Sequence, residues 1–312
     1  MKPRRVLARA VSAVLIGTAP VPFLALVASA TAGTAAVAPA LCGSSSHPAL
    51  AAKLTADIRA ARGGRASAVA VAAYDPGLGL GCWLSSTVHF DSASVVKVTI
   101  LGALLRKAED QRRSLTRAEA NLATAMITRS DNDAASALWA ELGRHDLQHF
   151  LNLAQMTHTV LGSGGYWGLT QITAYDEMRL LQFLLNPNSV LTAASRGYAL
   201  GLMAHVTASQ RWGVPVGAPA SLTVHVKNGW LPRATHGWRV HSIGCFTGRG
   251  GPYSIVVLTQ DNPSMAYGIA TIQAIARAIN RDLNPGAKPA APAPAPSRGT
   301  PDETIPALPS LP

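Results

Sequence analysis

Residues 69–86, VAVAAYDPGLGLGCWLSS, contain the pattern that decides the fold. Val69 and Val71 alternate with small residues, as in a half-buried strand. Asp75-Pro76-Gly77 is typical of a turn, and residues 81–86 can return as a second strand. The stretch therefore predicts a β-hairpin.

Outward from this hairpin, helices occupy the middle of the chain and strands its last third. Before the hairpin, Leu50, Leu54 and Ile58 recur at helical spacing until Gly63-Gly64. Further helices are predicted over 95–107, from Thr116 onward behind a Thr116-x-x-Glu119 capping box, and over 134–142, 175–185 and 265–282. Strand patterns lie at 222–228, 238–246 and 253–260. This order predicts an α+β fold in which an antiparallel five-stranded sheet is built from both chain ends and flanked by helices, with an all-helical region inserted.

The two ends of the chain differ in composition from the domain between them. Residues 1–32 begin with basic residues and continue through an apolar stretch to Ala30-Thr31-Ala32, which predicts a cleaved signal peptide. An uncleaved membrane anchor is the alternative, although two prolines interrupt the stretch. Residues 285–312 hold nine of the 21 prolines, as in an extended, disordered Pro/Ala-rich tail. We therefore predict a linker over 33–46 and one domain over 47–284.

The chain stays basic after removal of the predicted signal peptide, which is itself the indication of export. Removal of residues 1–32 takes away four positive residues and no negative one, so the formal net charge falls from +11 to +7. We expect a protein that is secreted or held in the cell envelope, where it is attracted to anionic wall polymers. The positive residues are scattered and no nucleic-acid motif is present, so nucleic acid is not an expected partner.

The three cysteines lack the spacing of metal ligands, and an oxidising compartment allows one disulfide with one thiol left over. If the first helix packs antiparallel to the first strand, its start lies near the second strand. We therefore pair Cys42 with Cys82 and leave Cys245 free.

Ser94-Val95-Val96-Lys97 stands at the start of an apolar helix, where one turn puts Ser94 and Lys97 on the same face. A serine hydroxyl needs a base to become a nucleophile, and a partly desolvated lysine can serve as that base. Only six of the 27 basic residues are lysines, so Lys97 stands where arginine, which does not deprotonate, could not act. The alternative is a surface lysine near an ordinary serine, since such a pair occurs about once by chance in a chain of this length.

Two further motifs follow at separate places in the chain. Ser130-Asp131-Asn132 lies between two helices, where its side chains can project into a cleft; alternatively, it only caps the next helix. Lys227-Asn228-Gly229 ends an alternating strand, where glycine allows close approach of a ligand; alternatively, it is a strand-ending turn. Each alternative can hold by itself, but the order and spacing of all three motifs favour a common site.

S-x-x-K, S-D-N and K-T-G are the signature of class A β-lactamases and penicillin-binding proteins, and this chain resembles that family over roughly residues 46–283. The resemblance implies a β-lactamase/transpeptidase-like fold. It implies Ser94 as the acylated nucleophile, Lys97 as its proton acceptor and Ser130 as the proton shuttle to the departing nitrogen. The substrate contacts that it implies come from Asn132, Lys227, Asn228 and Gly229, with the backbone N–H groups of Ser94 and Trp230 as the oxyanion hole.

The sequence departs from the family pattern at two points. Asn228 stands where the family usually has threonine or serine. A β-lactamase of this class also needs a carboxylate after S-D-N to activate the deacylating water, and residues 147–175 contain no Asp or Glu. Asp176 and Glu177 follow, but Thr173-x-x-Asp176 is typical of a capping box. The acylation residues are thus all present, while the deacylating acid is missing.

Other residues around the motifs give weaker indications. The stretch from Gly162 to Gly168, with Tyr166 and Trp167, is expected to be a flexible loop with aromatic contacts. The residues expected to rim the cleft, with one arginine assisting carboxylate binding, are Trp230, Trp238, Arg233 and Arg239.

From these observations we expect an exported serine hydrolase that is acylated at Ser94 by a β-lactam or a related small amide or ester derived from peptidoglycan, with slow deacylation. The first alternative is a D,D-peptidase or esterase acting on the cell wall. The second is a catalytically silent wall-binding module. No cofactor and no metal is implied, because no His/Cys/Asp cluster has ligand spacing, and a monomer is expected.

Overall fold

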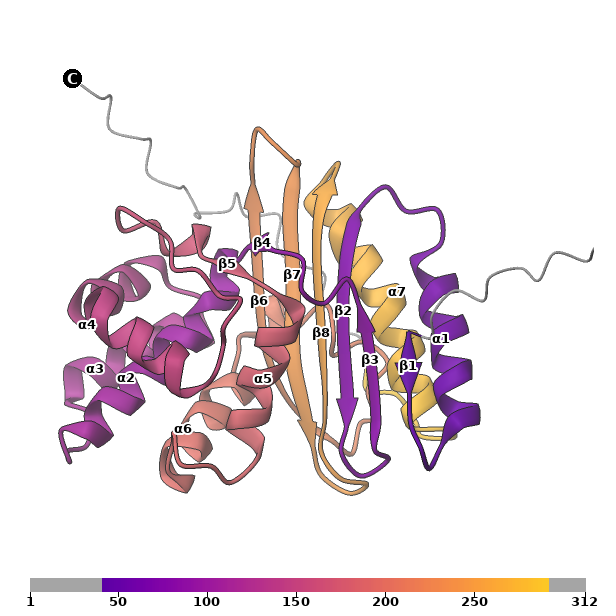
Figure 1. Cartoon of the computed structure of the whole chain (residues 1–312), viewed down its shortest axis with the longest axis horizontal. Helices are drawn as coiled ribbons and strands as arrows, with labels where there is room; N and C mark the ends of the chain where they lie inside the picture. Colours follow the sequence, from indigo (N-terminus) through magenta and orange to yellow (C-terminus); the bar gives the residue numbers. More distant parts are fainter. Residues whose placement is uncertain (1–40, 292–312) are drawn as a thin grey trace, which may run out of the picture. The chain divides into compact units, whose positions relative to one another are not determined.

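A six-stranded antiparallel sheet forms the centre of residues 41–291, the part of the chain that the computed structural model describes (Figure 1). Its strand order is β1-β3-β2-β8-β7-β6, so strands from both chain ends lie side by side, as predicted. The strands are β1 (Cys42–Gly43), β2 (Ala68–Asp75), β3 (Leu80–Leu84), β6 (Thr223–Pro232), β7 (Trp238–Thr247) and β8 (Tyr253–Asn262). The predicted signal peptide and most of the predicted tail lie outside the described residues.

The sheet contains one strand more than the five predicted. β1 is two residues long and pairs Cys42 with Cys82 and Gly43 with Gly81 of β3, within the range expected to be a linker. Two residues leave no alternating pattern, so the sequence could not reveal this strand. The predicted disulfide between Cys42 and Cys82 is confirmed, and it joins the same two strands. Cys245 is free and buried in β7.

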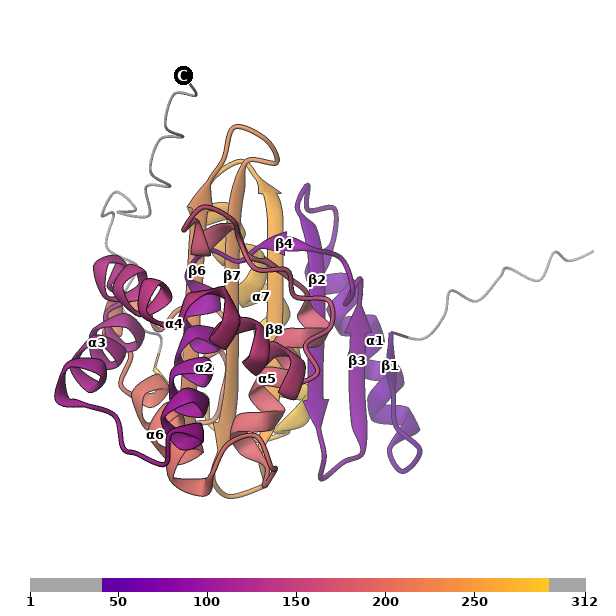
Figure 2. The same cartoon turned by 60° about the vertical axis from the view of Figure 1, so that its left-hand side comes forward.

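Helices cover both faces of the sheet (Figure 2). α1 (Pro48–Arg62) and α7 (Met265–Leu283) pack together on one side, and α5 (Ala174–Leu185) packs against β2 and β8 on the other. Because both faces are covered, the central strands carry apolar side chains in both directions, and Val71, Ile243 and Val257 are fully buried. No helix within residues 41–291 combines the length and apolar character needed to cross a membrane.

The inserted helical region lies beside the β6 edge of the sheet (Figure 1). Its helices are α2 (Lys97–Asp110), α3 (Arg117–Thr128), α4 (Asn132–Leu153) and α6 (Ala193–Ala204), with short elements η1 (Ala93–Val96), η2 (Trp167–Leu169) and η3 (Ala208–Gln210) and a small ladder between β4 (Phe90–Asp91) and β5 (Gln171–Ile172). The predicted capping box at the start of α3 is present in both directions. The helix predicted to end at Gly143 breaks there, because Gly143 has non-helical backbone angles (φ 60°, ψ 176°), and a second helical segment of α4 follows directly.

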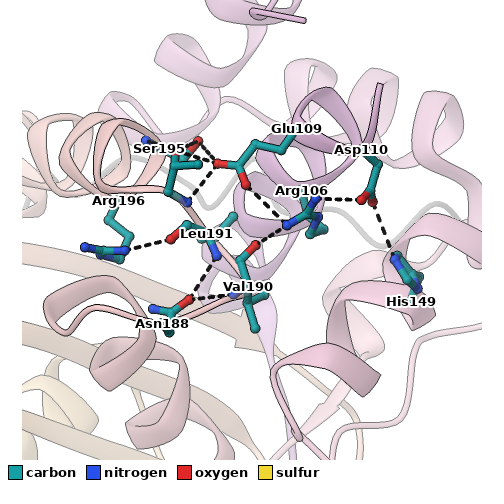
Figure 3. A network of polar contacts seen from close by, with 10 residues as sticks. Arg106, Glu109, Asp110, His149, Asn188, Val190, Leu191, Ser195 and Arg196 are labelled. Carbon is teal, nitrogen blue, oxygen red and sulfur yellow. Dashed lines mark hydrogen bonds and ion pairs between the residues drawn. The ribbon is translucent and has the colours of Figure 1, made fainter. Parts of the chain in front are cut away.

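A polar network ties the end of α2 to the start of α6 (Figure 3). Glu109 accepts hydrogen bonds from Ser195 Oγ at 2.5 Å and from Thr192 Oγ1 at 2.7 Å. Arg106 bridges from α2 to the carbonyl of Val190 at 2.7 Å and pairs with Asp110 at 2.6 Å. Since α2 begins at Lys97, the last residue of the first motif, this network fixes the far end of the helix that carries Lys97.

Candidate active site

Ser94 lies in the 3₁₀ turn η1, directly before α2. The start of the turn is fixed, because the backbone N–H of Ser92 donates to the carbonyl of Thr170 at 2.8 Å. Ala93 has a positive φ of 46°, a conformation that costs a residue with a side chain about 1–3 kcal/mol. Ser94 itself is fully buried. The surrounding structure therefore holds this serine in a strained turn rather than in the regular helix that we expected.

The side chains of the three motifs meet at the hydroxyl of Ser130. Lys97 Nζ donates to the Ser130 carbonyl at 2.7 Å, to Ser130 Oγ at 3.2 Å and to Asn132 Oδ1 at 2.6 Å. Lys227 Nζ donates to the same Oγ at 2.9 Å and to the carbonyl of Asn228 at 2.7 Å. Both lysine side chains are fully buried, so these oxygens take the place of water around their ammonium groups.

The second motif divides its side chains between this cluster and the helix behind it. Ser130 has a positive φ of 58°, which turns the chain sharply before α4. Asp131 Oδ1 accepts from the backbone N–H of Ala134 at 2.8 Å and caps α4. Asn132, the first residue of α4, turns its side chain to Lys97 instead. The capping alternative therefore holds for Asp131 but does not describe the other two side chains.

Gly229 lets β6 pass very close to the serine turn. A Cβ atom at Gly229 would lie 2.8 Å from the backbone nitrogen of Ser94 and 2.9 Å from that of Val95, distances that real Cβ atoms do not reach. Only glycine therefore fits at this position. Trp230 is the next residue of β6, so the two N–H groups expected to form the oxyanion hole belong to adjoining segments.

Asn228 makes a different contact from the one that we expected. Its Nδ2 donates to the carbonyls of Gln210 at 2.7 Å and of Trp212 at 2.9 Å, which uses both N–H bonds. Its Oδ1 is buried and finds no hydrogen-bond partner within residues 41–291. A substrate carboxylate needs donors, and this amide has already used its own. In this structure the Asn228 side chain therefore links Gln210 and Trp212 to β6, and its N–H groups do not point to a substrate carboxylate.

Asp91, which carries no sequence motif, anchors the strand that leads into the serine turn. Arg239 Nη2 lies 2.9 Å from its Oδ2, Arg233 Nε lies 3.8 Å from the same atom, and Gln171 Nε2 donates to its Oδ1 at 2.6 Å. The side chain of Arg239 is 5% exposed and that of Arg233 28% exposed. Arg239 is therefore buried and paired with Asp91. Of the two arginines expected at the rim, only Arg233 is partly exposed to solvent.

The two acids at the start of α5 have opposite surroundings. Asp176 accepts hydrogen bonds from the backbone N–H of His158 and from Thr159 Oγ1, both at 2.8 Å. Thr173 caps α5 by accepting from the N–H of Asp176 at 3.1 Å. Half of the expected capping box is thus present, because the Asp176 carboxylate turns to the preceding loop instead of back to Thr173.

Glu177 is fully buried, and neither of its carboxyl oxygens finds a hydrogen-bond partner among the described residues. Burial, followed by the negative charge of Asp176, raises the pKa of Glu177 well above its ordinary value of 4.5. Burial without hydrogen-bond donors disfavours the ionised carboxylate that a water-activating base needs. Glu177 is therefore unsuited to the role of water-activating base.

An aromatic side chain lies directly over the site lysine. Trp167, in η2, has its ring centroid 4.7 Å from Lys97 Nζ, which is a cation–π contact. In the sequence, Trp167 was identified only as an aromatic residue of a glycine-rich loop. No local signal could have revealed the contact, because it joins residues that are far apart in the chain.

The site residues are placed by a fold that is shared with known enzymes. A sequence profile of the β-lactamase enzyme family matches residues 119–283, more than half of the chain, including Ser130 and Lys227. No curated protein matches the chain in sequence.

Solved structures with a similar fold include three β-lactamases. A β-lactamase from Sphaerobacter thermophilus is 20% identical over 74% of this chain and 97% of its own, with a TM-score of 0.63. A class A β-lactamase from Bacteroides cellulosilyticus is 17% identical over 74% and 97%, with a TM-score of 0.66. A β-lactamase from Xanthomonas campestris is 19% identical over 75% and 99%, with a TM-score of 0.64. The match of the family profile, on this fold, shows that the chain belongs to the β-lactamase enzyme family.

Proposed function

We propose that the protein is an exported serine hydrolase that is acylated at Ser94 by β-lactams, or by a related amide or ester of the cell wall. The observation that carries the proposal is the Ser130 hydroxyl, which accepts hydrogen bonds from both Lys97 and Lys227. A hydroxyl held between two amines is suited to pass a proton from one group to the next. Membership of the β-lactamase enzyme family supports β-lactams as the substrate class.

In the acylation step, Lys97 in its neutral form takes the proton of Ser94, and Ser94 Oγ forms a bond to the carbonyl carbon. The C–N bond then breaks, Ser130 gives its proton to the departing nitrogen, and Lys97 returns a proton to Ser130. The backbone N–H groups of Ser94 and Trp230 stabilise the oxyanion, a contribution of about 10²–10³ in rate per donor. At the end of these steps Lys97 and Ser130 are back in their starting protonation states, and the departing nitrogen has gained the proton that Ser94 lost.

Substrate recognition falls to the remaining residues of the cluster. Asn132 contacts the substrate amide, and Gly229 lets β6 lie directly against the serine turn, so that the substrate meets both segments. Lys227 attracts the substrate carboxylate, aided by the more exposed of the two rim arginines, Arg233. Asn228 is left out of this set, because its N–H bonds are already used.

Deacylation is slow in this proposal. Residues 147–175 contain no acid, and burial without hydrogen-bond partners disfavours the ionised form of Glu177, which follows them. The same observations favour a second candidate function, a D,D-peptidase or esterase acting on the cell wall, in which the acyl-enzyme is a working intermediate with a wall peptide.

Export and a place in the cell envelope are part of the proposal. They are supported by the basic and apolar residues 1–32 and by the formal charge of +7 that the remaining chain keeps. Expression of the full chain followed by N-terminal sequencing of the secreted product tests this part. Retention of residues 1–32 on a cell-associated protein would contradict cleavage.

The central experiment is intact-mass spectrometry of the mature protein over time after mixing with a penicillin, with Ser94→Ala as the control. A persistent adduct on the wild type that is absent from Ser94→Ala is expected. An adduct that disappears while penicilloate accumulates would mean efficient β-lactam hydrolysis. Labelling of Ser94→Ala, or no adduct on the wild type, would refute acylation of Ser94 by β-lactams.

A further inference from the structure

The indole ring of Trp167 is held over Lys97 from two sides. Its face lies 4.7 Å from Lys97 Nζ, and its Nε1 donates to Ser136 Oγ at 3.1 Å. Ser136 stands one helical turn after Asn132 on α4, so the same face of this helix contacts both the ammonium group and the indole. On the other side, Ser92 Oγ donates to the carbonyl of Gly168 at 3.3 Å. The ring is therefore fixed relative to both the serine turn and α4.

The loop that carries Trp167 is closed on itself. The N–H of Gly162 donates to Thr170 Oγ1 at 3.1 Å, which joins its two ends. A Cβ at Gly162 would lie only 2.1 Å from the carbonyl oxygen of Tyr166, so the loop backbone packs as tightly as glycine allows. The N–H of Leu169 donates to that same carbonyl at 3.0 Å. The loop expected to be flexible therefore has internal hydrogen bonds in this structure, and the expected aromatic contacts are made by Trp167.

The position of the ring bears on hydrolysis of an acyl group at Ser94. In that step a water oxygen forms a bond to the ester carbon, a base takes one water proton, the C–Oγ bond breaks, and Ser94 Oγ receives a proton. Lys97, three residues after Ser94 in the same motif, is the base that we assign to this step in its neutral form. Oxygens of Ser130 and Asn132 surround its Nζ on one side, and the Trp167 ring covers another. An aromatic face cannot replace an oxygen partner in orienting a water molecule.

We propose that Trp167 is a positioning residue that closes the Lys97 side of the site to water and so prolongs the life of the acyl-enzyme. This inference rests on the proposed acylation of Ser94, and it assigns to Trp167 control over the rate of deacylation. Exclusion of water by an apolar wall protects a reactive intermediate from hydrolysis.

The first test measures the decay of the penicillin adduct by intact mass after removal of free penicillin. Trp167→Ala should shorten the adduct lifetime by about tenfold or more, because water gains access to Lys97. Trp167→Phe keeps a ring over Lys97 and should restore a lifetime close to that of the wild type. Tyr166→Ala is the matched control, because it removes an aromatic side chain from the same loop. Equal lifetimes of wild type and Trp167→Ala, or equally short lifetimes of Trp167→Ala and either other variant, would overturn the proposal.

A second test does not need acylation. Cyanate carbamylates neutral, accessible amines, and peptide mass spectrometry can compare Lys97 with Lys53, whose side chain is 54% exposed. The ratio of Lys97 to Lys53 modification should rise several-fold in Trp167→Ala and stay at the wild-type value in Tyr166→Ala. An unchanged ratio in Trp167→Ala would refute the covering role. If penicillin leaves no adduct but this ratio rises, the proposed function fails while the covering role of Trp167 stands.

Discussion

Two regions of the molecule bury charged residues, and they treat them in opposite ways. Around Ser130, the ammonium groups of Lys97 and Lys227 reach oxygen acceptors at 2.6–3.2 Å. At the start of α5, Glu177 is equally buried, but its carboxyl group finds no hydrogen-bond partner within residues 41–291. The first region supplies oxygen acceptors to buried ammonium groups, whereas the second disfavours the ionised form of a buried acid.

The difference shows that burial by itself does not make a group reactive. A buried group can move protons at neutral pH only if its surroundings support both of its protonation states. The lysine cluster meets this condition through the Ser130 hydroxyl, which accepts from an ammonium group and can donate to a neutral amine, whereas the carbonyl and amide oxygens support only the charged form. Glu177 does not meet this condition, although it follows the second motif in the sequence, where a class A β-lactamase needs its deacylating acid. The same contrast explains why acylation is expected to be faster than deacylation.

The largest effect is expected from Lys97→Arg, which keeps the charge of the lysine cluster but removes its ability to accept a proton. The rate of adduct formation with penicillin should fall by about 10²–10⁴, the usual contribution of a general base. Stopped reactions analysed by intact mass measure this rate. A rate within a few-fold of the wild type would show that another group deprotonates Ser94.

Glu177→Gln removes the buried acid and should stabilise the protein by up to about 3 kcal/mol at pH 8. Because the folded-state pKa of Glu177 is raised, its favourable contribution is present below pH 4.5, the ordinary value, and is lost as pH rises toward the folded-state pKa. The gain from Glu177→Gln should therefore shrink at acidic pH, as measured by urea unfolding. Asp176→Asn is the matched control, and it should destabilise, because Asp176 has donors from His158 and Thr159. Destabilisation by Glu177→Gln at pH 8 would show that the carboxyl group has an ionised role.

Asn228→Ala separates a structural contact from a substrate contact within the lysine cluster. It leaves the carbonyls of Gln210 and Trp212 without their donor, so the free energy of unfolding should fall by about 2 kcal/mol. Urea unfolding in the absence of ligand measures this loss. If stability is unchanged and only penicillin binding weakens, the carboxylate-binding role expected from the sequence is restored.

The smallest effect is expected at Glu109, a partnered acid that contrasts with Glu177. Burial opposes its ionisation, but hydrogen bonds from Ser195 and Thr192 outweigh it and lower the pKa of Glu109. Its contribution is therefore present above pH 4.5 and is lost as pH falls through the folded-state pKa. Glu109→Gln should cost about 1 kcal/mol at pH 7 and less at acidic pH. A loss that grows toward low pH would contradict this assignment.

The sequence by itself determined most of the fold and the membership of the site. Strand and helix periods depend on residues a few positions apart, so β2, β3, α5 and α7 could be predicted closely. The capping box at α3 depends only on Thr116 and Glu119, and its prediction is confirmed. The motifs also indicated that Lys97, Ser130 and Lys227 belong to one cluster, and the structure brings these three side chains together.

Only the tertiary structure decided what each side chain contacts. Asn228 donates to the carbonyls of Gln210 and Trp212, a contact that the sequence did not predict. Asp91 pairs with Arg239, and the ring of Trp167 lies over Lys97. The strand β1 and the unpartnered state of Glu177 were likewise invisible in the sequence. The physical reason is the same in each case: hydrogen bonding, ion pairing and burial depend on neighbours that folding brings from distant parts of the chain, and local patterns contain no record of them.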